Sequence, residues 1–119
     1  MANQNAKGIK RIFNACFFSI AGFNAVWKHE EAFRQEVLLL IVTTPLALWL
    51  TDNKIERVLL IGSIIAVLVV ELLNSAVETT IDRIGLDRHE LSGRAKDIGS
   101  AAVSLSLALA AMTWALILV

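Results

Sequence analysis

The chain has 119 residues, of which 56% are hydrophobic and 18% charged, whereas soluble domains are about 45–50% hydrophobic and about 25% charged. Its 11 Lys and Arg residues balance its 11 Asp and Glu residues, which excludes a nucleic-acid-binding protein that depends on excess positive charge. The hydrophobic content excludes a disordered chain. The single cysteine, Cys16, excludes an internal disulfide and a cysteine metal site.

The first predicted helix covers residues 9–28 and is amphipathic. Polar residues, among them Lys10 and Lys28, fall largely on one side of it, and aromatic residues gather on the other. Such a helix suits the surface of a membrane, although a helix packed only against protein is the alternative. The apolar residues recur at the helical spacings of three and four: Ile9, Ile12, Phe13, Cys16, Phe17, Ile20, Phe23 and Trp27.

Three later segments carry no charge: residues 37–50, 58–70 and 98–119, with 14, 13 and 22 residues. The hydrocarbon core of a bilayer needs about 20 apolar residues in a helix, so only the last segment spans it unaided. The other two reach that length if their helices extend to about 31–50 and 55–84, with the added polar groups facing protein rather than lipid. A soluble helical bundle is the alternative for these two segments.

The fold class that follows is an all-α membrane protein with three transmembrane helices and an N-terminal surface helix, in one membrane-embedded domain over residues 1–119. The orientation follows from the cations, since cytoplasmic loops are rich in Lys and Arg. Nine of the eleven lie in residues 1–36 and 79–97. We therefore expect the N-terminus and the 79–97 loop on the cytoplasmic side of the inner membrane and the C-terminus outside.

The second membrane helix carries an unusual polar stripe. Glu71, Asn74, Glu78 and Asp82 follow each other at i, i+3, i+7 and i+11, which places them on one helical face. Ionisable residues at membrane depth are costly and usually serve a function. A structural polar cluster that seals helix contacts is the alternative, and for Asp82, which lies furthest out, it is the favoured one.

Two further polar groups are expected at the same membrane level. Paired carboxylates suit Mg²⁺, neighbouring cations suit phosphates, and phosphoryl transfer to a lipid hydroxyl is one chemistry that fits. The chain has no Walker A motif and no Gly-rich kinase loop. A small transporter subunit or a structural oligomer remains open. The two groups are Glu30, Glu31, Arg34, Gln35 and Glu36, and Asp87, Arg88, His89, Glu90, Arg94, Lys96 and Asp97.

Three motifs resemble those of the small prokaryotic diacylglycerol kinases. Residues 71–82, ELLNSAVETTID, are similar to the family signature E-x-L-N-[ST]-A-[IV]-E-x-x-x-D, where x is any residue. Residues 89–103, HELSGRAKDIGSAAV, resemble a second family block, and residues 31–36, EAFRQE, resemble a third. The resemblance extends from Arg11 to the last helix. This family is unrelated to soluble kinases, which agrees with the missing nucleotide motifs.

The resemblance implies a homotrimer of three-helix protomers that phosphorylates diacylglycerol with MgATP to give phosphatidic acid. Matched by position, Glu71 is the implied general base and Asn74 orients the site. Glu30 and Glu78 are the implied ligands of the Mg²⁺ ions that bridge the ATP phosphates. The implied ATP contacts are Arg11, Phe18, Glu30, Glu78, Asp87, Arg88, His89, Lys96 and Asp97, and the implied lipid contacts are Arg11, Gln35, Glu71 and Ser100.

Some positions depart from the family pattern. Phe18 stands where the family has Tyr, so only stacking remains there, and Asp87 and Arg88 replace the commoner Glu-Tyr. Undecaprenol kinases, which phosphorylate a polyprenol, share the fold and many of the carboxylates, and they are the alternative within the resemblance. The unbroken block at residues 91–97 is more similar to the diacylglycerol branch.

Overall fold

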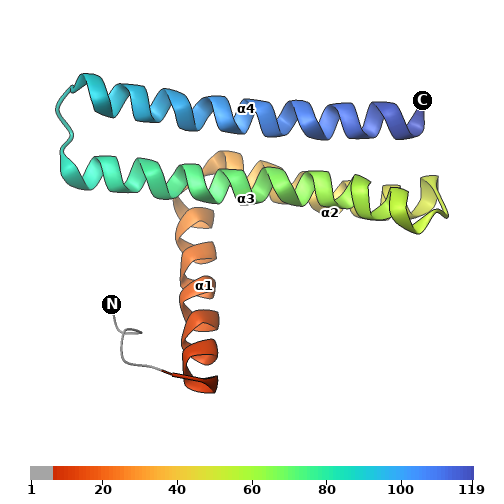
Figure 1. Cartoon of the computed structure of the whole chain (residues 1–119), viewed down its shortest axis with the longest axis horizontal. Helices are drawn as coiled ribbons and strands as arrows, with labels where there is room; N and C mark the ends of the chain where they lie inside the picture. The colour runs from red at the N-terminus through yellow and green to blue at the C-terminus, as the bar shows by residue number, and fades with distance from the viewer. Residues whose placement is uncertain (1–6) are drawn as a thin grey trace. The chain divides into compact units, whose positions relative to one another are not determined.

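The computed structural model describes residues 7–119, so residues 1–6 of the predicted domain lie outside the described residues. Four helices follow in chain order: α1 (Ile9–His29), α2 (Glu31–Leu50), α3 (Lys54–Ile84) and α4 (Glu90–Leu118) (Figure 1). The chain divides into two compact units, one that ends at Glu31 and one from Ala32 to Val119. The predicted all-helical fold class is confirmed.

The helix α1 forms the first unit, and it runs one residue further than predicted. It contains no buried residue, and its aromatic side chains, such as Phe13 and Phe17, are exposed. Lys28 and His29 occupy its last turn, where cations interact favourably with the helix dipole. Glu30 adopts an extended conformation and ends the helix. The amphipathic helix is therefore present, and its position at a membrane surface stays a prediction.

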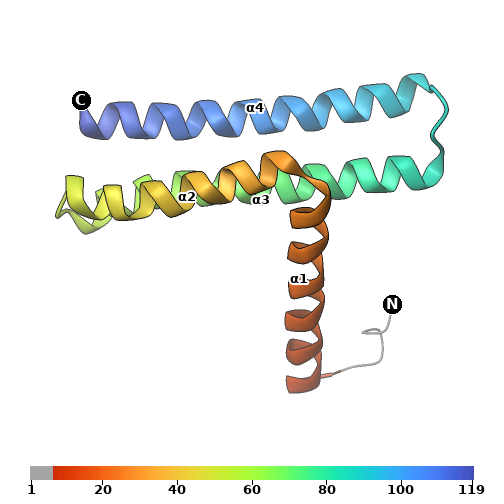
Figure 2. The ribbon, with the colours of Figure 1, turned by 180° about the vertical axis from the view of Figure 1, so that it is seen from behind.

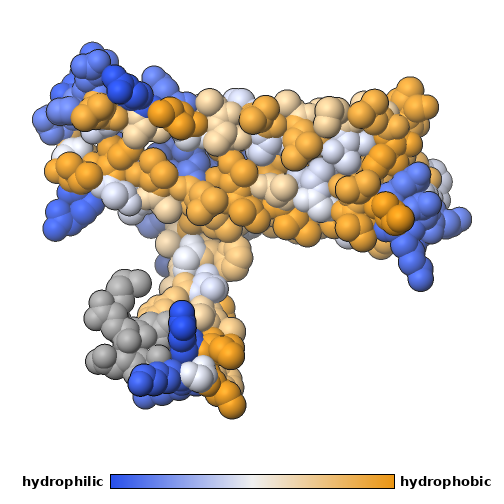
Figure 3. Space-filling view, viewed as in Figure 1, coloured by the Kyte–Doolittle hydropathy of each residue, from blue (hydrophilic) through white to orange (hydrophobic). Residues whose placement is uncertain are grey.

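The helices α2, α3 and α4 are each long and apolar enough to cross a membrane. Hydrophobic side chains cover the long middle part of the second unit in Figure 3, and hydrophilic ones gather at the α2–α3 turn and at the α3–α4 loop. Apolar surface in the middle with polar groups at both ends is the distribution that a bilayer selects. The chain is thus a multi-pass membrane protein, as the uncharged segments predicted.

The core of the second unit lies between α3 and α4, which pack side by side in opposite directions (Figures 1 and 2). Ile64, Val67 and Ala110 form its buried cluster, against which Leu40 of α2 and Trp114 of α4 pack. The Trp114 indole Nε1 donates a hydrogen bond to the backbone oxygen of Leu60 at 3.1 Å. An indole N–H that is partly buried usually finds such a partner, and this bond links the two helices near the C-terminal end of the chain.

The last helix begins at Glu90 and not near Ile98, so the sequence placed its start too late. The His89 side chain caps the helix, since its Nδ1 accepts a hydrogen bond from the Leu91 backbone N–H at 3.0 Å. The charged residues 90–97 form two further turns, because a polar surface does not prevent a capped helix from forming outside the apolar layer. The α3–α4 loop therefore shrinks to residues 85–89.

The α2–α3 turn is closed by side-chain hydrogen bonds. The Asn53 side chain caps α3 by accepting from the Glu56 backbone N–H at 3.0 Å. The Arg57 guanidinium donates to the backbone oxygens of Leu48 and Thr51, each at 2.7 Å. These carbonyls at the end of α2 lack partners within the helix, so Arg57 ties the end of α2 to the start of α3.

Replacing Arg57 with Met should lower the free energy of unfolding by about 1.5–3 kcal/mol, the usual range for hydrogen bonds to a charged group. Chemical unfolding in detergent micelles, followed by circular dichroism, measures the change. Asp52→Asn is the matched control, because it removes only the exposed 3.4 Å contact with Arg57, and exposed ion pairs contribute little. An equal loss in both variants would contradict the carbonyl-capping role.

Candidate active site

The polar stripe of α3 passes from the interior of the second unit to its surface. Glu71 is only 5% exposed, Asn74 and Glu78 are half-buried, and Asp82 is exposed. Ser75, one turn after Glu71, is also buried. The helical spacing thus sets a carboxylate in the buried interior and leads outward from it through polar groups, in the order that the sequence predicted.

Asn74 and Glu78 contact each other directly. The Asn74 Nδ2 donates a hydrogen bond to Glu78 Oε1 at 3.3 Å. The other amide atom, Asn74 Oδ1, is buried and has no hydrogen-bond partner. A buried acceptor without a partner is costly, and such groups in native structures tend to mark functional positions.

A second buried carboxylate, Glu36, comes from α2. It is 9% exposed, and its Oε2 has no hydrogen-bond partner. Glu71 is its charge neighbour. The sequence placed Glu36 only within a general polar group and gave it no role. The signal that it faces inward was its spacing of three from Phe33, which is 4% exposed, because residues three apart share a helix face.

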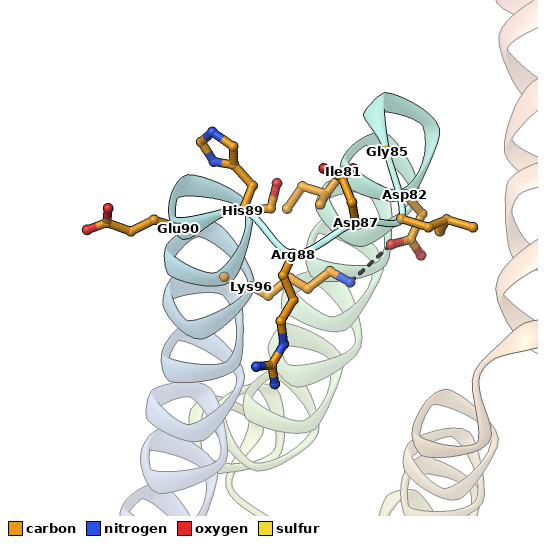
Figure 4. A pocket seen from close by; sticks show the side chains of 11 residues that line it. Ile81, Asp82, Gly85, Asp87, Arg88, His89, Glu90 and Lys96 are labelled. Carbon is orange, nitrogen blue, oxygen red and sulfur yellow. Dashed lines mark hydrogen bonds and ion pairs between the residues drawn. The ribbon is translucent and has the colours of Figure 1, made fainter.

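A polar pocket of about 520 Å³ lies where α3, the loop and α4 meet. It gathers four of the predicted ATP contacts, Asp87, Arg88, His89 and Lys96. Figure 4 shows Lys96 reaching from α4 to Asp82 on α3, and their Nζ and Oδ1 atoms lie 3.0 Å apart. The structure therefore brings a predicted cation into the pocket beside a carboxylate.

Two loop residues are held by local contacts. Because the neutral His89 ring accepts at Nδ1, its remaining hydrogen is on Nε2, which is left as a donor. Gly85 lies so close to Asp87 that a Cβ at position 85 would be 2.7 Å from Asp87 Oδ1. A side chain at position 85 would therefore displace the Asp87 carboxylate.

Other predicted site residues are distributed over several elements. Arg11 and Phe18 are exposed on α1, Glu30 is half-buried at the junction of α1 and α2 in the chain, and Gln35 is exposed on α2. Asp97 and Ser100 are exposed on α4, and Asp97 does not line the polar pocket. Among residues 7–119, no three His, Cys, Asp or Glu side chains are grouped closely enough to hold a metal ion by themselves.

Comparison with known proteins shows which family this chain belongs to. A family model described as prokaryotic diacylglycerol kinase matches residues 17–118. The chain belongs to the prokaryotic diacylglycerol kinase family. It is 49% identical to the diacylglycerol kinase of Escherichia coli K12 over 118 residues, which cover 99% of this chain and 96% of that one.

Other relatives match over similar lengths. The diacylglycerol kinase of Pseudomonas aeruginosa PAO1 is 51% identical over 111 residues, 93% of this chain and 90% of its own. That of Helicobacter pylori J99 is 40% identical over 109 residues, which cover 92% of this chain and 85% of that one. The resemblance of the three motifs is therefore confirmed, and neither the polyprenol kinase nor the transporter subunit is favoured. A kinase family implies ATP and usually a divalent metal.

Replacing Glu36 with Gln should raise the thermal unfolding midpoint, because it removes repulsion between two neighbouring buried carboxylates while keeping the shape of the side chain. The gain should reach at least about 4 °C. Thermal unfolding in detergent micelles measures it. Glu31→Gln, an exposed change on the same helix, should show no such gain; a matching gain there would contradict the argument.

Proposed function

We propose that this protein transfers the γ-phosphoryl group of ATP to the primary hydroxyl of diacylglycerol and forms phosphatidic acid. The observation that carries the proposal is the α3 stripe, in which one helix joins the buried Glu71 carboxylate to the polar pocket at Asp82. A lipid hydroxyl at membrane depth and a water-soluble nucleotide need these two environments side by side. Membership of the diacylglycerol kinase family supports the choice of acceptor.

Glu71 is proposed as the general base. Its carboxylate is buried in an apolar helix close to Glu36. It would take the proton from the lipid hydroxyl as the oxygen attacks the γ-phosphorus, while the bond from the γ-phosphorus to the bridging oxygen breaks and ADP leaves. A positioned base of this kind contributes about 10²–10⁴-fold to a rate. Burial also keeps water from the attacking position, which favours transfer to the lipid over hydrolysis of ATP.

The polar pocket is proposed to hold the nucleotide. Arg88 and Lys96 supply positive charge for the phosphates, and charge-assisted hydrogen bonds of this kind are roughly twice as strong as neutral ones. The α4 helix begins at the pocket with Glu90, and its free backbone N–H groups add a favourable site for phosphate. Asp87, His89 and Asp97, with Arg11 and Phe18 of α1, are the further proposed contacts.

Glu30 and Glu78 are proposed as the protein ligands of Mg²⁺. Carboxylate oxygens fit this ion, which usually takes one or two carboxylates and completes its shell with water and substrate phosphates. The half-buried Glu78, held by Asn74 at 3.3 Å, meets that requirement without a cage of three protein ligands. When bound, the ion would neutralise charge on the transferring phosphate.

The assembly and location are also proposals. We infer a homotrimer in the inner membrane, as the resemblance to the family implies. The 79–97 segment is proposed to be cytoplasmic, because nine of eleven cations lie in residues 1–36 and 79–97. The polar pocket then opens toward cytoplasmic ATP. Gln35 and Ser100, both exposed on the second unit, are proposed to contact the lipid acceptor together with Arg11.

An acceptor panel tests the function. Diacylglycerol, monoacylglycerol, ceramide and undecaprenol would each be presented in detergent micelles with Mg²⁺ and ATP labelled at the γ-phosphate. Transfer to diacylglycerol well above transfer to undecaprenol is the expected result. Preferred transfer to undecaprenol would overturn the proposed acceptor. The absence of label from all four lipids would overturn the proposed kinase activity.

Glu71→Gln should lower kcat with diacylglycerol at least about 10²-fold, because the amide cannot accept the hydroxyl proton. The change keeps the side-chain shape, so the oligomeric state and thermal unfolding should stay near those of the wild type. Glu56→Gln, at the other end of α3, is the matched control and should keep full activity. Full activity in Glu71→Gln would contradict the assignment of Glu71 as the general base.

Lys96→Met should weaken nucleotide binding about 10- to 100-fold, the equivalent of one charge-assisted contact with phosphate. Titration with a fluorescent ATP analogue, in the absence of lipid, measures the dissociation constant. Lys54→Met removes the same charge at the far end of α3 and should leave that constant unchanged. Equal dissociation constants in wild type and Lys96→Met would place the phosphates elsewhere.

A further inference from the structure

The α3 and α4 helices are in close contact beside the polar stripe, at Asn74 and Gly99. A Cβ added to Gly99 would overlap the Asn74 amide oxygen and would lie 3.1 Å from Asn74 Cγ. Side-chain atoms on well-packed helices do not approach this closely. Any residue larger than glycine at position 99 therefore pushes the Asn74 amide out of its place.

The orientation of this amide is determined by what lies on its two sides. Glu78 is a carboxylate, which accepts hydrogen bonds when ionised, so the Asn74 group that faces it at 3.3 Å is the Nδ2 donor. The Oδ1 acceptor consequently faces Gly99, along one of its Cα–H bonds, where it is buried and has no conventional partner. A weak Cα–H···O contact of the kind common between helices remains there.

The other helix glycines lack this constraint. A Cβ at Gly62 of α3 or at Gly93 of α4 would meet nothing within 4 Å. Glycine is unfavourable in a helix interior, so alanine at such a position normally stabilises. A glycine retained at a close helix contact has a reason beyond backbone freedom, and at position 99 that reason is the room it leaves for Asn74.

We propose that Gly99 is a positioning residue for the reaction, because its missing side chain lets α4 hold the Asn74 amide against the Glu78 carboxylate. The role of Gly99 in activity rests on the proposed function, in which Glu78 binds the metal. The effect of Gly99 on the Asn74–Glu78 contact does not depend on the proposed function. Gly99 itself touches no reacting atom and acts only through Asn74.

Gly99→Ala should displace the amide and break its contact with Glu78. The carboxylate then loses the donor that orients it. Loss of a hydrogen-bond partner of a metal ligand usually lowers metal affinity or activity about 10- to 100-fold. We expect kcat/KM for MgATP to fall about 10- to 100-fold and the Mg²⁺ concentration for half-maximal activity to rise. The thermal unfolding midpoint should also fall, against the trend of helix propensity.

A double-mutant cycle separates this role from a general packing defect. The variants are Gly99→Ala, Asn74→Ala and the two combined, and Gly62→Ala is the matched control. A Cβ at position 99 lies 3.9 Å from the Asn74 Cβ, an ordinary contact, so the two alanines fit together. The combined variant should therefore unfold no earlier than Asn74→Ala alone and should equal it in activity. Gly62→Ala should unfold no earlier than the wild type and should match it in activity.

Three results would overturn the proposal. One is an equal loss of unfolding midpoint when Gly99→Ala is added to the wild type and to the Asn74→Ala variant. Another is failure of both Gly99→Ala and the combined variant to fold, because the collision would then not be with Asn74. The third is a Gly99→Ala protein with wild-type unfolding and wild-type activity. A wild-type protein without kinase activity would instead refute the proposed function, while the unfolding measurements would still test the Asn74–Gly99 contact.

Discussion

The close antiparallel packing of α3 against α4 brings together most of the side chains on which the candidate site depends. Small residues permit it: Ala110 packs into the buried cluster with Val67, and Gly99 admits the Asn74 amide. Without this approach, Lys96 would not reach Asp82 and the polar pocket would have no second wall. In a membrane, where apolar helices gain little by leaving lipid for protein, such close contacts are what holds helices together.

The polar groups at this interface have a cost for stability. Glu36 and Glu71 are buried and repel each other, and Asn74 keeps an acceptor without a hydrogen-bond partner. An apolar replacement of similar volume would usually pack at least as well. The cost is understandable if these groups act on a substrate, because a base and an orienting amide must remain available to bind another molecule.

The α3 helix also separates two environments by a defined length. Eleven residues from Glu71 to Asp82 correspond to about 16 Å along the axis, and this distance takes the chain from a buried carboxylate to an exposed one. Asn74 and Glu78 lie between them and contact each other. A single helix thus connects a buried carboxylate with an exposed one that lines the polar pocket, in keeping with the proposed transfer between a soluble donor and a membrane acceptor.

The helices and the polar stripe could be predicted from the sequence, because hydrophobic period, uncharged length and carboxylate spacing are local properties of the chain. The family was recognisable for the same reason, since its motifs are contiguous. The start of α4 was missed, because the His89 cap outweighs the charges that follow it. The inward position of Glu36 beside Glu71, the Asp82–Lys96 pair and the wedge of Asn74 against Gly99 join different helices. Only the tertiary structure decided these contacts, because they depend on how closely and in which register two helices pack.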